Sequence, residues 1–299
     1  MIYHEPVLLN ESIEGLAINP EGIYVDVTFG GGGHSAEILK KLIKGKLIAF
    51  DQDEDAIKNN KIKDERFELI NQNFKYLKNY LKVFGVDKVD GILADLGISS
   101  HQIDDAGRGF STRFNAELDL RMNIKNKETA KDIINNYPVD QLKQIFAEYG
   151  ELKNAFKIAS TIDKKRKTES INTVDQLKGS IKHLSYKGKE NKFFAQIFQA
   201  LRIKVNEELK VLKEMILQAT DVLKSHGRLV IISYHSLEDR LIKNFMKSGN
   251  FEGKLNKDFY GNILKPFIVI SKKPIVPSFE EVEKNNRSRS AKLRIAEKI

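Results

Sequence analysis

The sequence predicts an α/β fold: a Rossmann-like parallel sheet interrupted by an all-helical insertion. Strand-like and helix-like segments alternate over the first hundred residues, which is typical of right-handed crossovers between parallel strands. Strand patterns are then absent from about residues 104–192 and resume only at residue 228. The 299 residues are 41% hydrophobic and 30% charged, enough chain and enough apolar surface to bury such a core.

The first third of the chain supplies the sheet and its first helices. The expected strands are residues 23–29, 46–50, 67–70 and 89–94. Helical patterns cover residues 35–42 and 76–84, and Asp55 opens a further helix. The first strand stops at four consecutive glycines, the second at Asp51 and the fourth at Asp95. Because α/β sheets bind ligands at the carboxyl ends of their strands, these three features mark the expected site.

Helical periodicity dominates the middle of the chain. Apolar residues from Val139 to Tyr149 recur at helical spacing and stop at Gly150, expected to be a left-handed terminator. Thr173 with Gln176 forms a capping box, and a long amphipathic stretch runs from Phe194 to Leu223. Strands resume at residues 228–234, 266–271 and 293–296. We therefore expect one discontinuous domain, residues 1–103 and 199–299, around an inserted helical domain, residues 104–198.

Composition narrows the class of protein. The chain has no cysteine, which excludes disulfides, thiolate zinc sites, iron–sulfur clusters and a cysteine nucleophile. Its apolar runs are only a few residues long, and its first residues lack the basic start and apolar run of a signal peptide. These features predict a cytoplasmic protein that makes no membrane contact.

Positive charge is concentrated in two regions. The formal charge is +9; residues 151–192 carry eleven Lys or Arg against five acids, and residues 284–298 carry six against one. Either region alone is more simply a solvated surface. Two of them on a basic chain favour a nucleic-acid partner, because clustered cations release the counterions condensed on a phosphate backbone.

The glycine run predicts a nucleoside cofactor. Residues 31–36, Gly-Gly-Gly-His-Ser-Ala, match the G-x-G-x-x-G/A fingerprint, and Asp51 follows Gly30 by 21 residues, where a carboxylate can bind a ribose diol. NAD and S-adenosylmethionine both satisfy this pattern. Three residues favour the methyl donor: Asp26, four residues before the glycines; Phe74, after the third strand; and Asp95. Core packing is the simpler role for Phe74, and a helix cap or turn is an equally good one for Asp95.

Eight sequence blocks in order carry a more specific signal. They are His4-x-Pro-Val-Leu-Leu-x-Glu11, Asp26-x-Thr-Phe-Gly-x-Gly-Gly-His-Ser35, Asp95-Leu-Gly-Ile-Ser-Ser-x-Gln-x-Asp104, Arg108-Gly-Phe-Ser111, Leu118-Asp-x-Arg-Met122, Phe198-Gln-Ala-Leu-Arg-Ile-x-Val-Asn206, Ser233-Tyr-His-Ser-Leu-Glu-Asp-Arg240 and Arg287-x-Arg-Ser-x-x-Leu-Arg294. Through these blocks the chain resembles, along nearly its whole length, the ribosomal RNA small subunit methyltransferase H family. Its members are bacterial S-adenosylmethionine-dependent 16S rRNA (cytosine-N4)-methyltransferases.

The resemblance implies a methyltransferase sheet, with S-adenosylmethionine as cofactor, and an RNA-recognition role for the insertion. It implies cofactor contacts at Gly32, Gly33, His34, Asp51, Phe74, Asp95 and Gln102. Asp95 and Ser99 are the expected catalytic residues; a contact to the methionine amine of the cofactor is the alternative for Asp95, and a main-chain carbonyl of residues 96–100 is the alternative to Ser99. His235, Arg287 and Arg289 are the expected contacts to substrate RNA, and a solvated tail is the alternative for the two arginines. The resemblance further implies 16S rRNA within the small ribosomal subunit as the partner and no requirement for a metal. The sequence does not decide between a monomer and a homodimer.

Several block residues have simpler structural roles. Ser236 with Asp239 reads as a capping box, and His235 is equally compatible with packing at the rim of the sheet. Arg108, Phe110 and Arg121 can order a loop or touch RNA, and Asp119 beside Arg121 suggests a local ion pair. The chain departs from the family at His101, Lys204 and Asn286, none of which is an expected cofactor contact.

Two other functions compete with methyl transfer. A nicotinamide dehydrogenase is supported only by the glycine fingerprint, and no hydride-transfer pair stands out beyond the fourth strand. A non-catalytic RNA-binding protein with this fold would not need to keep the glycine loop, Asp51 and Asp95.

Overall fold

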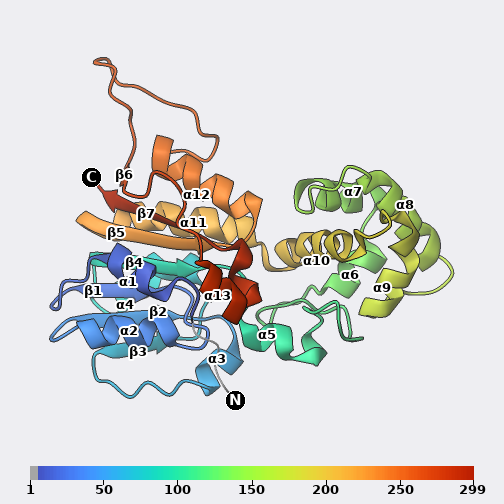
Figure 1. Cartoon of the computed structure of the whole chain (residues 1–299), viewed down its shortest axis with the longest axis horizontal. Coiled ribbons are helices and arrows are strands. Elements are labelled where there is room, and N and C mark those ends of the chain that lie inside the picture. The colour runs from blue at the N-terminus through green and yellow to red at the C-terminus, as the bar shows by residue number, and fades with distance from the viewer. Residues whose placement is uncertain (1–5) are drawn as a thin grey trace. The chain divides into compact units, whose positions relative to one another are not determined.

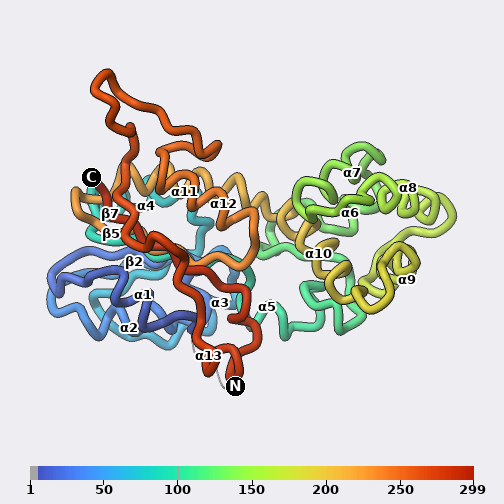
Figure 2. The backbone as a smooth tube through the Cα atoms, turned by 45° about the horizontal axis from the view of Figure 1, so that its top comes forward, coloured from blue at the N-terminus to red at the C-terminus, as the bar shows by residue number. Residues whose placement is uncertain are grey.

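The computed structural model describes residues 6–299, apart from the side chain of Ser100, so His4 of the first block lies outside the described residues. The chain forms two compact units (Figures 1 and 2). One unit contains the chain up to Gly97 together with Leu209–Ile299, and the other is Ile98–Glu208. The second unit begins six residues earlier and ends ten residues later than the insertion expected at residues 104–198.

The first unit is built on a seven-stranded sheet of order β3-β2-β1-β4-β5-β7-β6. The five strands from β3 to β5 are parallel, which confirms the Rossmann-like prediction, whereas β7 pairs antiparallel with both β5 and β6. The strands are β1 (Ile23–Asp26), β2 (Lys46–Phe50), β3 (Phe67–Ile70), β4 (Val89–Asp95), β5 (Leu223–Ser233), β6 (Phe267–Val269) and β7 (Lys292–Lys298).

Helices cover both faces of this sheet, and side chains that alternate along the strands pack against them. On β5, Leu229 and Ile231 belong to the core beneath α4 (Leu77–Val83), α11 (Glu208–Val222) and α12 (Ser236–Ser248). Val230 and Ile232 belong to the opposite core, beneath α1 (Leu9–Leu16) and α2 (Gly33–Lys41). Burial on both faces is typical of parallel strands between helices. The remaining elements are α3 (Glu54–Lys58), η1 (Phe74–Tyr76), α13 (Phe279–Lys284) and η4 (Asn286–Ser290).

The second unit is helical and has a core of its own. Its elements are α5 (Ser100–Asp104), η2 (Ala106–Arg108), α6 (Ala130–Asn136), α7 (Val139–Glu148), α8 (Ala155–Arg166), α9 (Val174–Ile181), η3 (Lys182–Leu184) and α10 (Glu190–Asn206). Phe146, Ile158, Leu177 and Ile197 are fully buried in this core. The expected capping box of Thr173 and Gln176 opens α9.

One sequence-based expectation about a helix end was wrong. Gly150 does not terminate α7 through a left-handed conformation; Glu151 has the positive φ, 50°. A Cβ on Gly150 would lie 2.8 Å from the carbonyl oxygen of Phe146, so close backbone packing excludes a side chain there. The stretch from Phe194 to Leu223 is interrupted at Glu207, whose φ of 50° separates α10 from α11 at the end of the second unit.

Within the described chain, no helix is both long and apolar enough to cross a bilayer.

Candidate active site

The carboxyl ends of β1, β2 and β4 bring three acidic side chains to one edge of the sheet in the first unit. Asp26 ends β1, Asp51 directly follows β2, and Asp95 ends β4. Between Asp26 and α2, the chain turns through Gly30 and Gly32, whose φ values of 53° and 79° favour glycine. A Cβ on Gly30 would meet only the carbonyl oxygen of Thr28, at 3.9 Å, so the loop leaves space above its backbone.

Asp51 ties the glycine loop to β2. Its Oδ2 accepts a hydrogen bond from the Gly30 N–H at 2.8 Å, and its Oδ1 accepts one from the Asp53 N–H, also at 2.8 Å. Burial raises the pKa of Asp51 to about 6, although these hydrogen bonds oppose the shift. A carboxylate has about four acceptor positions, so each oxygen can accept one more hydrogen bond. Asp51 can therefore accept hydrogen bonds from a diol at the loop, and its role in cofactor binding stays a prediction.

Asp26 has a different environment. Its side chain is only 1% exposed, and it accepts hydrogen bonds from the Ser35 hydroxyl at 2.7 Å and the Thr28 N–H at 3.0 Å. Burial raises its pKa. These contacts connect β1 to the start of α2, so Asp26 fixes the shape of the glycine loop.

Asp95 is contacted by two side chains from other elements. The hydroxyl of Tyr234, the residue directly after β5, donates a hydrogen bond to Asp95 Oδ1 at 2.8 Å. His34 Nδ1, on α2, lies 3.9 Å from Asp95 Oδ2. Burial raises the pKa of Asp95 to about 6, while His34 and Tyr234 act in the opposite direction. The Asp95 side chain is nevertheless 23% exposed, so one edge of the carboxylate is available to a ligand.

The two partners of Asp95 are themselves buried. Burial raises the pKa of Tyr234 well above its usual value, and the neighbouring Asp95 adds to this shift, so the tyrosine stays protonated and can act only as a donor to the carboxylate. Burial also lowers the pKa of His34, despite the opposing effect of Asp95, which favours the neutral imidazole. His34 Nε2 lies 3.2 Å from the Val7 carbonyl oxygen. Sequence reasoning did not single out Tyr234; only the adjacency of β4 and β5 in the sheet reveals it.

His235 is the N-cap of α12. Its Nδ1 accepts a hydrogen bond from the Glu238 N–H at 3.3 Å, and the Glu238 carboxylate accepts one from the His235 N–H. The capping box predicted for Ser236 and Asp239 was thus displaced by one residue: it is formed by His235 and Glu238. Asp239 instead accepts a 2.6 Å hydrogen bond from Arg294 on β7.

The other expected site residues of the first unit occupy the same edge of the sheet or the C-terminal segment. Gly32 precedes α2 and Gly33 begins it. Phe74 begins η1 after β3 and packs partly against the core. Arg287 and Arg289 lie on η4, just before β7; Arg289 is exposed and Arg287 is partly buried.

Ser99 and Gln102 belong to the second unit, where they form a capping box. The Ser99 hydroxyl accepts from the Gln102 N–H at 3.2 Å, and Gln102 Oε1 accepts from the Ser99 N–H at 3.0 Å. Both side chains therefore have a local structural role at the start of α5, which sequence reasoning had not assigned to them.

Two arginines of the family blocks order a loop of the second unit. Arg108 donates hydrogen bonds to the carbonyl oxygens of Arg121 and Met122, and Arg121 donates to Asn126. Arg121 also forms the expected ion pair with Asp119, at 2.7 Å. Phe110 is buried in the helical core.

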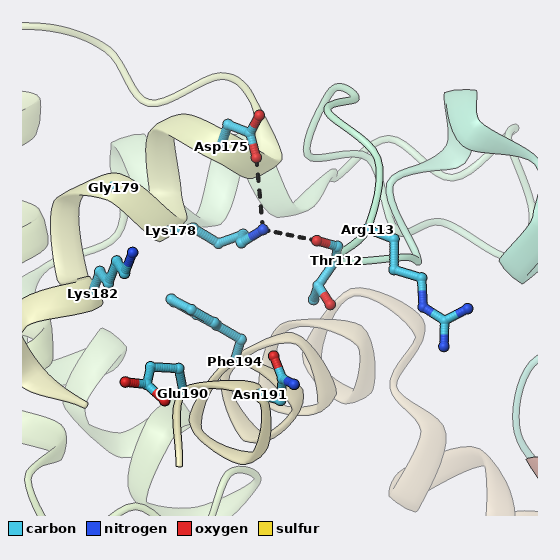
Figure 3. Close-up of a pocket in the computed structure, with 9 residues that line it drawn as sticks. All are labelled: Thr112, Arg113, Asp175, Lys178, Gly179, Lys182, Glu190, Asn191 and Phe194. Atoms are coloured by element: carbon cyan, nitrogen blue, oxygen red, sulfur yellow. Dashed lines mark hydrogen bonds and ion pairs between the residues drawn. The ribbon is translucent and has the colours of Figure 1, made fainter. Parts of the chain in front are cut away.

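The second unit also contains a cationic pocket of about 750 Å³ (Figure 3). Lys178 lies across it: the ammonium group donates to the Thr112 carbonyl oxygen at 2.8 Å and lies 5.7 Å from the centre of the Phe194 ring. Arg113 and Lys182 also line the pocket. The acidic residues Asp175 and Glu190 lie on its wall, so a ligand would meet both cations and carboxylates.

Comparison with known proteins identifies the family. The family model described as "MraW methylase family" matches residues 1–299. This chain belongs to that family. It is 58% identical to a protein of Christiangramia forsetii over 300 residues, covering all of this chain and 99% of the relative. It is also 58% identical to a protein of Cytophaga hutchinsonii, covering 99% and 100% of the two chains. Both relatives are named ribosomal RNA small subunit methyltransferase H, in agreement with the resemblance found in the sequence.

Among solved structures, a putative methyltransferase from Streptococcus mutans in complex with SAH is 14% identical to this chain, with both chains fully covered and a TM-score of 0.44. That score is too low to equate individual residues.

Proposed function

We propose that the protein transfers a methyl group from S-adenosylmethionine to the exocyclic N4 amine of a cytidine in 16S rRNA of the small ribosomal subunit. The observation that carries this proposal is the Asp95 carboxylate at the carboxyl edge of the sheet, oriented by Tyr234 and next to His34. Family membership and the names of the relatives support an rRNA substrate. A small-subunit substrate also implies a cytoplasmic enzyme.

The residues at the loop fit the cofactor. The open space above Gly30 suits the amino-acid end of an S-adenosyl ligand, and the remaining acceptor positions of Asp51 suit its ribose. Gly32, Gly33, His34, Phe74, Asp95 and Gln102 are the further contacts that we propose. When bound, the cofactor supplies an electrophilic methyl group on a sulfonium.

The target amine needs help from the protein, because its lone pair is delocalised into the cytosine ring. Asp95 Oδ1 is occupied by the Tyr234 hydroxyl, which leaves Oδ2 to accept a hydrogen bond from the amine. With a pKa of about 6, Asp95 is ionised at neutral pH and can hold the amine in line for attack. In this proposal the amine loses one proton on methyl transfer, and Asp95 accepts it. We propose Ser99 as a second acceptor of the amine.

RNA contacts come from both units in this proposal. His235, Arg287 and Arg289 bind substrate RNA in the first unit. In the insertion, the pocket lined by Arg113, Lys178 and Lys182 supports an RNA-recognition role. Lys178 lies over the Phe194 ring and is paired with Asp175 at 3.7 Å, so Arg113 and Lys182 are the cations of the pocket that we propose for contacts to phosphates.

Transfer of labelled methyl groups tests the proposal. The protein is incubated with radiolabelled S-adenosylmethionine and either unmethylated small subunits or free 16S rRNA. We expect label in RNA from at least one substrate and its loss with Asp95→Asn. No transfer to either substrate, or a thermal shift with NADH but none with S-adenosylhomocysteine, would overturn the assignment.

A further inference from the structure

The connection between α12 and β6 carries the two most exposed aromatic side chains in the described chain. Phe259 is 98% exposed and Tyr260 is 86% exposed. In both views the segment between these elements stands clear of the sheet (Figures 1 and 2). A ring so exposed contributes almost no buried area to folding, so the stability of the fold does not explain either side chain.

An organised turn presents the two rings. Asp258 Oδ1 accepts hydrogen bonds from the N–H groups of Tyr260 and Asn262, both at 2.9 Å, and Oδ2 accepts one from the Asn262 amide at 3.0 Å. Gly261 has a φ of 86°, which favours glycine. Below the turn, Lys257 and Ile263 form an antiparallel bridge. The rings lie edge to face, with centroids 5.6 Å apart. A turn fixed in this way presents its rings at little entropic cost to binding.

The surroundings of the rings are strongly cationic. Residues 243–273 contain seven lysines and two acids, an excess of five positive charges that the sequence analysis did not single out. Six of the lysines are exposed, and none of the seven pairs with a carboxylate in the part of the chain that the structure describes. One of the two acids, Asp258, is engaged by the turn itself.

We propose that this hairpin, residues 254–264, is a contact for single-stranded RNA, with Phe259 and Tyr260 stacked on unpaired bases and the lysines facing phosphates. The proposal rests on the proposed function for its RNA substrate and adds a binding surface to it. Bases of every kind have a face that stacks on aromatic rings, and lysines beside such rings follow the backbone. A site for a protein partner would not need this excess of positive charge.

The hairpin and Asp95 lie toward opposite ends of the strands. Helix α12 starts at the carboxyl end of β5 and runs back, so the segment leaves the sheet at the edge opposite to Asp95. The hairpin therefore contributes to RNA affinity and leaves cofactor binding and the reacting atoms unaffected.

A fluorescent reporter tests the stacking directly. The chain contains no tryptophan, so Tyr260→Trp introduces a single one at the tip of the hairpin. We expect a single-stranded oligouridylate to quench its emission, with a midpoint that moves to higher RNA concentration as salt is added. Unchanged emission at oligonucleotide concentrations that saturate the protein in a filter-binding assay would overturn the proposal.

Matched variants test the contribution to the substrate. Phe259→Ala with Tyr260→Ala should raise the KM for unmethylated small subunits by at least about five-fold, the lower end of the effect of losing one base stack. The exchange Phe259→Tyr with Tyr260→Phe keeps both rings and should keep the affinity. Leu264→Ala removes an apolar side chain that is 58% exposed on the same hairpin and should change nothing.

An unchanged KM in the double alanine variant would overturn the proposal. An equal loss with Leu264→Ala would also overturn it, in favour of an apolar surface for a protein partner. Methylation by the wild-type protein distinguishes failure of the hairpin proposal from failure of the proposed function. If it methylates subunits while the ring variants behave like wild type, only the hairpin proposal fails. If it methylates nothing, the proposed function fails, and the oligouridylate titration still decides the role of the hairpin.

Discussion

Replacing Tyr234 with phenylalanine removes one hydrogen bond from Asp95 and keeps the ring. The Tyr234 hydroxyl donates to the carboxylate at 2.8 Å and so stabilises its ionised form. A hydrogen bond to a charged group contributes about 1.5–3 kcal/mol, and one pKa unit corresponds to about 1.36 kcal/mol, which gives a shift of about one to two units. Because the Asp95 side chain is 23% exposed, water replaces part of the lost interaction, and we expect about one unit.

The sign of the change follows from the charge. Loss of the donor destabilises the carboxylate, so the pKa of Asp95 rises from about 6 to about 7. The ionised fraction at pH 7 then falls from roughly nine-tenths to roughly one-half. The assay is the pH dependence of kcat/KM, which reports the free enzyme. The acid limb should move upward by about one unit, and the two enzymes should converge in activity at about pH 9.

A second buried tyrosine provides the control. Tyr24 is 1% exposed, and its hydroxyl accepts a hydrogen bond from the Asn19 N–H in the same unit, so Tyr24→Phe removes a buried hydroxyl without touching Asp95. Its acid limb should stay at the wild-type pH. An unmoved limb in Tyr234→Phe, or an equal shift in Tyr24→Phe, would refute the coupling between Tyr234 and Asp95.

Three further results are expected. Asp95→Asn should lower both S-adenosylmethionine affinity, measured by calorimetry, and turnover at saturating cofactor; near-normal values for both would remove the residue from the active site. At about a hundred times its dissociation constant, S-adenosylhomocysteine should stabilise the wild-type protein by about 2.7 kcal/mol in a thermal shift. Asp51→Ala should weaken that binding through loss of the diol acceptor; an unchanged dissociation constant would contradict the role. Neutralising Lys164 and Lys182 should flatten the plot of log RNA affinity against log salt concentration, by somewhat under one unit of slope per lost phosphate contact. A wild-type slope would show that these lysines are solvated and do not contact RNA.

The structure shows which cations of residues 151–192 can be replaced to test RNA binding. In the sequence, Arg166 and its neighbours form a run of cations, all of them candidates for phosphate contacts. In the helical unit, however, Arg166 donates to the Ile134 carbonyl oxygen at 2.7 Å and pairs with Asp163 at 2.9 Å, with its side chain only 12% exposed. Removing it would disturb the packing of the insertion. Lys165 and Lys167 are also paired, with Glu169 and Asp163.

The sheet was largely predictable because its signals are local. The strands β2 and β3 have the predicted bounds, since each is a short, mostly apolar segment between polar turns. The position of Asp51 beside the glycine loop followed from the rule that parallel strands end at one edge.

The environment of Asp95 was not predictable, because it depends on contacts between residues distant in the chain. Tyr234 is 139 positions from Asp95 and meets it only because β5 pairs with β4. His235 could not be assigned from the sequence either. Histidine is an uncommon N-cap, whereas serine is a common one. The sequence therefore predicted Ser236 as the N-cap, one residue after the observed N-cap, His235.

The chemical identity of the product tests the central claim most directly. Unmethylated small subunits are incubated with the protein and with S-adenosylmethionine carrying a deuterated methyl group, and the RNA is digested to nucleosides for mass spectrometry. The proposed role of Asp95 predicts that the label appears in N4-methylcytidine and is lost with Asp95→Asn. Label on cytosine carbon 5, on a ribose 2′-oxygen or on another base would contradict the claim that this carboxylate holds a cytosine amine for methyl transfer.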